Sequence, residues 1–257
     1  MVARSRAFLG AATLLFAACT TVTVVWCASM SALGGMPMPG DWTMSMAWMR
    51  MPGQTWLGAA ASFLAMWAVM MVAMMLPSLV PMLWRYRQAV GTAGTAHLSR
   101  LTALVGAGYF SIWAVFGMFA FPLGVTLVRV VMRLPAVARA VPIAVGWVVL
   151  IAGLLQFTAW KARQLGCCRE TPGQGRGLPG DAVTAWRYGT RLGLHCCYCC
   201  CGLTASLLVI GVMDLRAMAV TTAAVNVERL AGERAARAIG AAVMGAGLVL
   251  IARGGNF

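Results

Sequence analysis

The chain has 257 residues, of which 61% are hydrophobic and 10% are charged, and its mean hydropathy is +0.82. A soluble domain carries about 25% charged residues, so this composition excludes an ordinary soluble protein and indicates a chain that lies in a lipid bilayer. The formal charge of +14 comes from bases scattered through short loops, which is typical of membrane topology and argues against nucleic acid as a partner.

Long apolar segments follow one another along the chain and predict an all-α fold, a polytopic transmembrane helix bundle of six or seven spans. The segment that begins near residue 7 resembles a signal sequence, but its apolar stretch is too long and no clear cleavage site follows. We therefore expect an uncleaved first span and a single integral membrane domain over residues 1–257. The expected spans cover about residues 7–30, 56–83, 101–128, 141–160, 192–213, 215–229 and 238–252.

The sixth of these segments is short, because its apolar residues supply about 20 Å of helix against a hydrocarbon core of about 30 Å. We expect it to extend, to be re-entrant or to be buried in the bundle. Most basic residues fall on one side when the N-terminus is placed inside. The positive-inside rule then predicts a cytoplasmic N-terminus in the bacterial inner (cell) membrane.

This orientation makes residues 161–191 a cytoplasmic loop. The loop is polar and contains Cys167 and Cys168. Thiols on that side are kept reduced, so we expect no disulfide framework and we expect cysteines that can bind a soft metal.

Five cysteines lie within six positions at the start of the fifth span, in the run His195-Cys196-Cys197-Tyr198-Cys199-Cys200-Cys201. On a helix, Cys196, Cys199 and Cys200 share one face, while Cys197, Cys200 and Cys201 share the adjacent face. Thiolates favour Cu(I), Zn(II) and iron–sulfur clusters, and His195 could add an imidazole. Small buried apolar packing is the alternative for any one of them, but five thiols beside a histidine favour metal or redox chemistry.

Methionines form a second sulfur-rich pattern. The outer loop contains Met36, Met38, Met44, Met46, Met49 and Met51 among tryptophans. In the second span, Met66, Met70 and Met74 recur every four residues, with Met71 and Met75 beside them. Neutral thioethers suit Cu(I) or Ag(I), and the row runs from the outer loop towards the inner cysteines. An interfacial loop and ordinary helix packing are the alternatives.

Ionisable residues occur near the ends of the later spans. We expect Asp214, Arg216, Glu228 and Arg229 to reach the interface and to serve structural roles, since long side chains snorkel from span ends. His97 lies in a basic inner loop and is expected to be solvated. No phosphate-binding glycine loop, zinc protease motif or nucleophile elbow appears, so we expect no enzyme activity.

Four blocks of residues occur in a fixed order along the chain. They are Met71-Val-Ala-Met74-Met75-Leu-Pro77-Ser78-x-x-Pro81-Met82; Gln156-x-Thr158-x-x-Lys161 with Cys168-Arg169; Gly193-Leu194-x-Cys196-x-x-Cys199-Cys200; and Gly211-Val212-Met213-Asp214-Leu215 with Met218 and Glu228-Arg229. This order resembles the bacterial "predicted metal-binding integral membrane protein" family, a domain of unknown function with some members labelled copper chaperones. That family commonly has Asn where Asp214 stands, Lys where Arg229 stands, and fewer thiols in the cysteine block.

The sulfur pattern and the resemblance together favour an integral membrane protein that binds a soft transition metal for transfer across or along the inner membrane. Cu(I) is the leading metal, with Zn and Ag as other soft candidates, and the expected partners are the lipid bilayer, the ion, and a copper chaperone or metalloenzyme. The outer-loop residues expected to capture the ion are Met44, Met46, Met49 and Met51. The residues expected to relay it along the second span are Met70, Met71, Met74 and Met75. The candidate metal ligands are Cys196, Cys199, Cys200, Cys197, His195, Cys168, Met71, Met74 and Met75.

Two alternatives stay open at this point. One is a membrane thiol–disulfide oxidoreductase that uses Cys196-x-x-Cys199 or Cys197-x-x-Cys200, which would need a thiol with a depressed pKa. The other is a non-catalytic assembly subunit for a copper enzyme, in which the sulfurs serve mostly as packing.

Overall fold

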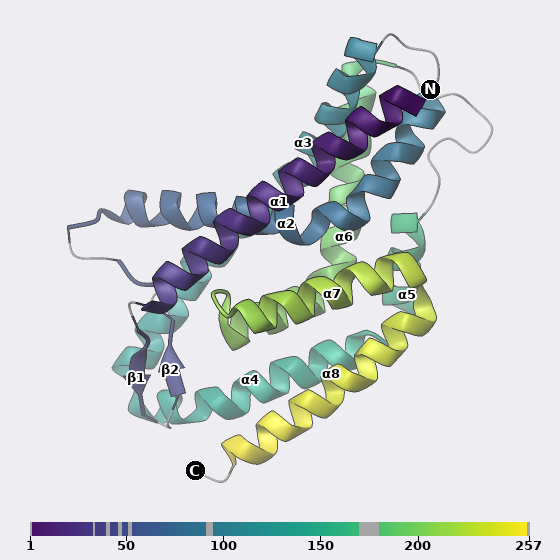
Figure 1. Ribbon diagram of the computed structural model, residues 1–257. Coiled ribbons are helices and arrows are strands. Elements are labelled where there is room, and N and C mark those ends of the chain that lie inside the picture. The colour runs from purple at the N-terminus through teal and green to yellow at the C-terminus, as the bar shows by residue number, and fades with distance from the viewer. Residues whose placement is uncertain are drawn as a thin grey trace.

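The computed structural model describes residues 2–32, 34–39, 42–45, 48–50, 53–90, 95–169 and 180–255. Within these ranges the chain is almost entirely helical, which confirms the expected all-α class (Figure 1). The elements in chain order are α1 (Val2–Ala32), β1 (Met36–Met38), β2 (Trp42–Met44), α2 (Trp56–Val90), α3 (Thr95–Arg133), α4 (Pro135–Leu155), α5 (Ala159–Arg169), α6 (Ala182–Gly211), α7 (Leu215–Ala231) and α8 (Glu233–Gly254).

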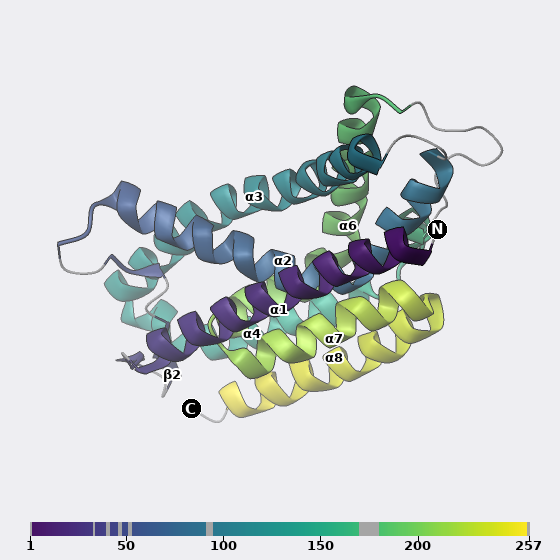
Figure 2. The same ribbon diagram turned by 45° about the horizontal axis from the view of Figure 1, so that its top comes forward.

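Six of the described helices, α1, α2, α3, α4, α6 and α8, are long and apolar enough to cross a membrane. The chain is therefore a multi-pass membrane protein. The short α7 is not among them: its 17 residues give about 25 Å of helix. It packs against α2, α6 and α8, and both views show it running alongside α8 (Figures 1 and 2).

Several helices extend beyond the apolar segments that the sequence marks. Part of the region expected as the loop 161–191 is helical, because it contains α5 and the first turns of α6. The α6 helix begins at Ala182 because the carboxylate of Asp181 accepts a hydrogen bond from the Thr184 amide across 2.9 Å. That backbone hydrogen bond holds the pKa of the exposed Asp181 carboxyl below its usual value. Hydropathy marks the bilayer-depth part of a helix and not the polar turns that continue it.

Glycines set the distance between α3 and α6. A Cβ on Gly189 would lie 2.2 Å from the Val105 carbonyl oxygen, and one on Gly193 would lie 2.7 Å from the Tyr109 carbonyl oxygen. Helices in membranes approach closely where such small residues face the neighbour. The close approach brings the Tyr109 side chain of α3 within hydrogen-bond distance of α6.

The buried core of the bundle is rich in sulfur and aromatic rings. On α2, six methionines are buried against neighbouring helices and not turned towards lipid: Met66, Met70, Met71, Met74, Met75 and Met82. They belong to one contiguous cluster with Trp67, Tyr109 and Trp113 and with the buried cysteines. The outer surfaces instead carry exposed apolar side chains such as Leu14, Leu57 and Phe119, as lipid contact requires.

A candidate metal centre between α5, α6 and α7

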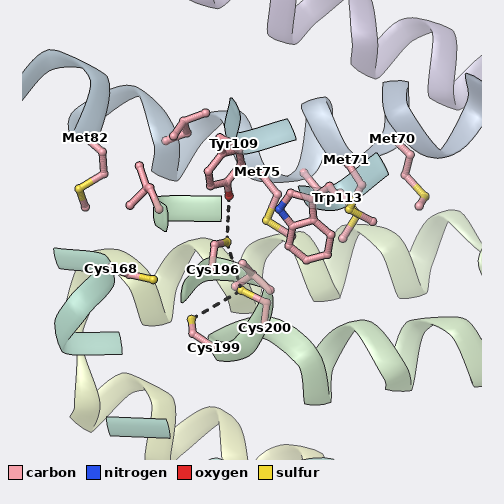
Figure 3. Packing of buried hydrophobic residues seen from close by; sticks show 14 of the residues in the cluster. Met70, Met71, Met75, Met82, Tyr109, Trp113, Cys168, Cys196, Cys199 and Cys200 are labelled. Carbon is pink, nitrogen blue, oxygen red and sulfur yellow. Dashed lines mark hydrogen bonds between the residues drawn. The ribbon is translucent and has the colours of Figure 1, made fainter. Parts of the chain in front are cut away.

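Three cysteine thiols of α6 meet in the core, and a fourth cysteine, on α5, is buried in the same cluster. The Sγ atoms of Cys196 and Cys200 are 3.8 Å apart, and those of Cys199 and Cys200 are 3.7 Å apart (Figure 3). Cys168, from α5, is buried in the same cluster of side chains. All four residues are at most 2% exposed. The face of α6 predicted from helical spacing is therefore the face that lies against the other helices.

The sulfur spacing suits a shared ion. A metal–thiolate bond is about 2.3 Å for zinc, and three or four sulfurs around one such ion are separated by about 3.8–4.0 Å. Of the two separations, 3.8 Å lies at the lower edge of that range and 3.7 Å lies just below it. Small side-chain adjustments would bring these thiols around one soft cation.

A buried carboxylate borders the thiols. One oxygen of Glu228 and the Sγ atoms of Cys199 and Cys200 lie within 4.8 Å of one another. Glu228 Oε1 is paired with the Lys161 ammonium across 2.6 Å, and Lys161 also donates a hydrogen bond to the Cys199 carbonyl oxygen. The other oxygen, Oε2, has no hydrogen-bond partner among the described residues. A buried carboxylate oxygen without a partner is costly, and a bound cation would satisfy it.

A second set of polar groups contacts the thiols from α3 and α7. The Tyr109 hydroxyl donates a hydrogen bond to Cys196 Sγ across 2.9 Å, and Arg229 Nη1 donates to that hydroxyl across 3.2 Å. Arg229 Nη1 also lies 2.7 Å from Ser78 Oγ, whereas its Nε and Nη2 have no partner in the described part of the chain. The guanidinium thus retains donors and a positive charge beside groups that become anionic when they bind metal.

A glycine ends α7 directly after the turn that contains Glu228 and Arg229. The helix stops at Gly232, whose φ of +92° is a backbone conformation that residues with a Cβ rarely adopt. The Gly232 amide bonds back to the Glu228 carbonyl oxygen across 2.9 Å. Glu228 and Arg229 therefore lie in the last turn of α7, inside the bundle.

Two of the other predicted ligands lie outside this cluster. His195 Nδ1 pairs with Gln164 Oε1 of α5 across 2.8 Å. Cys197 is partly exposed and packs against the edge of the buried cluster, and Cys167 and Cys201 are also partly exposed. All nine cysteines are free thiols.

The methionines of α2 border the same cluster. Met71, Met74 and Met75 are buried in it, and Figure 3 shows Met71 and Met75 beside Trp113 on the side that faces Cys196 and Cys200. The Nδ2 of Asn226, on α7, donates to the Met74 carbonyl oxygen across 2.9 Å and ties α7 to α2 at this level.

One of the predicted capture residues, Met44, lies in the hairpin that β1 and β2 form. Met44 of β2 is buried and stands opposite Met36 of β1 in the antiparallel register. Met49 is half-buried. Met46 and Met51 lie outside the described residues. The hairpin therefore places two of the outer-loop thioethers on one face.

The expectation for Glu228 and Arg229 was wrong. They do not reach the interface, since they are 0% and 1% exposed. The physical reason is that α7 is packed among other helices, where Lys161, Tyr109 and Ser78 meet the two charges. Asp214 does have a structural role, because it caps α7 by accepting from the amides of Arg216 and Ala217. Lys161 and Glu228-Arg229 belong to the same ordered set of four blocks as the cysteines, and this is the signal that could have revealed them.

These features define a class: a polytopic membrane protein with a buried cluster of thiols bordered by a carboxylate, a guanidinium and thioethers. The family model described as "Copper chaperone" (PpoB2) matches residues 64–250. The chain therefore belongs to this copper chaperone family, as the four sequence blocks predicted. No curated protein and no solved structure gives a significant match. The matched range covers α2 from residue 64 and all of the candidate centre, and it leaves out α1 and the hairpin.

Proposed function

We propose that this protein binds Cu(I) at the buried cysteines and passes it on, across or along the membrane, to an acceptor. Cys196, Cys199 and Cys200 hold the ion, with Cys168 and Glu228 at the edge of the centre. The observation that carries the proposal is the pair of sulfur separations, 3.7 and 3.8 Å, between three thiols that are buried inside the bundle. The ion is cargo, so the centre has to both accept and release it.

The charges around the thiols favour a monovalent ion. With two of the three cysteines bound as thiolates and the third as a neutral thiol, the ligands and one Cu(I) carry a net charge of −1, which the nearby Arg229 guanidinium neutralises. The Lys161–Glu228 pair is neutral in itself. A balanced set of charges avoids the several kcal/mol that each unpaired buried ion costs. Soft sulfur also selects Cu(I) over harder cations.

The methionine row supports movement of the ion towards this centre. Thioethers bind Cu(I) without losing a proton, so they can exchange it with little change in charge. The buried methionines of α2 lie in the same cluster as the cysteines. We propose that they relay the ion from the hairpin side and that Cys167 and Cys168 accept it on the polar side. A copper chaperone or a copper enzyme would be the partner.

The deciding experiment is an anaerobic Cu(I) titration of purified protein against a competing chelator. The triple variant Cys196→Ser/Cys199→Ser/Cys200→Ser is expected to bind one equivalent less than the wild type. The matched control is Cys197→Ser/Cys201→Ser, which removes two thiols from the partly exposed face of the same helix and is expected to retain that equivalent. Equal binding by the wild type and the triple variant would end the proposal.

The two sequence-based alternatives predict other results. Thiol–disulfide exchange needs an accessible thiolate. The four thiols of the centre are buried, so a reversible disulfide between them in cells would be unexpected on our account and would support an oxidoreductase. An assembly subunit would co-purify with a stable partner and without metal.

A further inference from the structure

A second group of sulfur atoms lies elsewhere in the bundle. The Sγ of Cys27, on α1, is 3.8 Å from the Sδ of Met218, on α7, and 3.9 Å from the Sδ of Met213, in the turn between α6 and α7. Cys27 is 1% exposed and Met218 is 6% exposed. Cys27 thus lies beside two thioether sulfurs that come from 186 and 191 residues further along the chain, in a largely buried place.

This group is separate from the cysteine centre. Met218 lies in the first turn of α7 and Glu228 in its last, and ten residues of helix between them span about 15 Å. Cys27 is near the C-terminal end of α1, and the methionine-bearing hairpin follows directly after that helix (Figure 1). The family model begins at residue 64, so α1 and Cys27 lie outside the part of the chain that it matches.

We propose that Cys27, Met213 and Met218 form a second binding site for a monovalent soft cation, Cu(I) or Ag(I). The separations of 3.8 and 3.9 Å match those of sulfurs that share one ion with bonds of about 2.3 Å. When the ion binds, the Cys27 thiol loses its proton to water and a sulfur–metal bond forms, and no electrons are transferred.

The charge of this site selects the ion. One thiolate and two neutral thioethers carry a charge of −1, so a monovalent cation leaves the site neutral. A divalent ion such as Zn²⁺ would leave a net positive charge in the bundle, which is costly to bury. The site therefore differs from the cysteine centre, where several thiols, Glu228 and Arg229 surround the metal.

The test uses Ag(I), which is redox-inert, as a probe in the background of the triple variant Cys196→Ser/Cys199→Ser/Cys200→Ser. That variant is expected to retain one tightly bound Ag(I). Adding Cys27→Ala is expected to abolish this binding, and adding Met218→Leu, which conserves side-chain volume, is expected to weaken it at least tenfold. The matched control is Cys19→Ala, since Cys19 is a half-buried cysteine of the same helix, two turns before Cys27.

The outcomes separate this site from the cysteine centre. A wild type that binds one ion and a triple variant that binds none would overturn the second site and leave the proposed function standing. A wild type that binds one ion, with binding lost in Cys27→Ala and kept in the triple variant, would support the second site alone. Cys27→Ala and Met218→Leu, each added to the triple variant, must first elute as monodisperse helical proteins. If both then bind as much Ag(I) as the triple variant alone, the second site does not exist.

Discussion

The Tyr109 hydroxyl of α3 donates a hydrogen bond to the Cys196 thiol of α6, with 2.9 Å between the oxygen and the sulfur. The same hydroxyl accepts a hydrogen bond from Arg229 of α7. One phenol thus joins three helices at the candidate metal centre. It stabilises a thiolate at Cys196 by donation and holds the guanidinium nearby.

The variant Tyr109→Phe should therefore weaken metal binding without unfolding the bundle. Loss of a hydrogen bond to a metal-binding group typically costs about 10–100-fold in affinity. A chelator competition that gives the Cu(I) dissociation constant would measure this. Tyr198→Phe is the control, because Tyr198 lies among the same cysteines in the sequence but is exposed, with its ring tilted against that of Trp160. Similar affinities for Tyr109→Phe and wild type would show that the phenol does not act on the centre.

The glycine contact between α3 and α6 predicts a steric effect on the same centre. In Gly193→Ala the new methyl group would lie 2.7 Å from the Tyr109 carbonyl oxygen, so the two helices must move apart. We expect a loss of about 1–3 kcal/mol in the free energy of unfolding together with weaker metal binding.

Thermal unfolding in detergent, with and without Cu(I), would check this prediction. Gly106→Ala is the matched control, because Gly106 is on α3 and a Cβ there meets nothing within 4 Å. Alanine favours a helix interior, so this control should be as stable as the wild type or slightly more stable. A Gly193→Ala protein with unchanged stability and affinity would contradict the close packing.

The buried Lys161–Glu228 pair predicts strong coupling between its members. Lys161→Met leaves the Glu228 carboxylate buried without its partner, which typically costs about 3–5 kcal/mol. The double variant Lys161→Met/Glu228→Leu should recover most of that loss, because no charge then remains unpaired.

A double-mutant cycle on the free energy of unfolding measures this coupling. The exposed pair Glu233–Arg237 provides the comparison, and Arg237→Met should change stability by less than about 1 kcal/mol. If the effects of Lys161→Met and Glu228→Leu are additive, the two side chains do not interact in the folded protein.

The methionines of α2 allow the relay to be tested apart from binding. Met71→Leu/Met74→Leu/Met75→Leu conserves volume, so stability should change little. If thioethers carry the ion, copper should load the cysteine centre more slowly in this variant. The rate should fall by about tenfold for each 1.4 kcal/mol added to the barrier. The equilibrium affinity of the cysteine centre for Cu(I) should stay within a few-fold of the wild-type value.

Stopped-flow Cu(I) loading of protein in liposomes would give this rate. Leu64→Met/Leu79→Met is a control for altered α2 packing without loss of thioethers. Unchanged loading in the Leu variant would assign the methionines to packing alone.

Helical spacing and hydropathy were sufficient to predict the multi-pass bundle and the shared face of Cys196, Cys199 and Cys200, because both depend on local sequence. They could not predict the pairing of Lys161 with Glu228, since it depends on how α5 and α7 pack against α6. The same limit explains the wrong assignment of Arg229 to the interface: its partners Ser78 and Tyr109 come from distant parts of the chain. Cys27 illustrates it further, since only the folded bundle brings it to Met213 and Met218.

X-ray absorption at the copper edge of anaerobically loaded protein tests the central claim most directly. The account predicts a first shell of sulfur at about 2.3 Å in the wild type, with the amplitude assigned to the cysteine centre lost in Cys196→Ser/Cys199→Ser/Cys200→Ser. A first shell of nitrogen and oxygen alone, or a spectrum that the three substitutions leave unchanged, would contradict it.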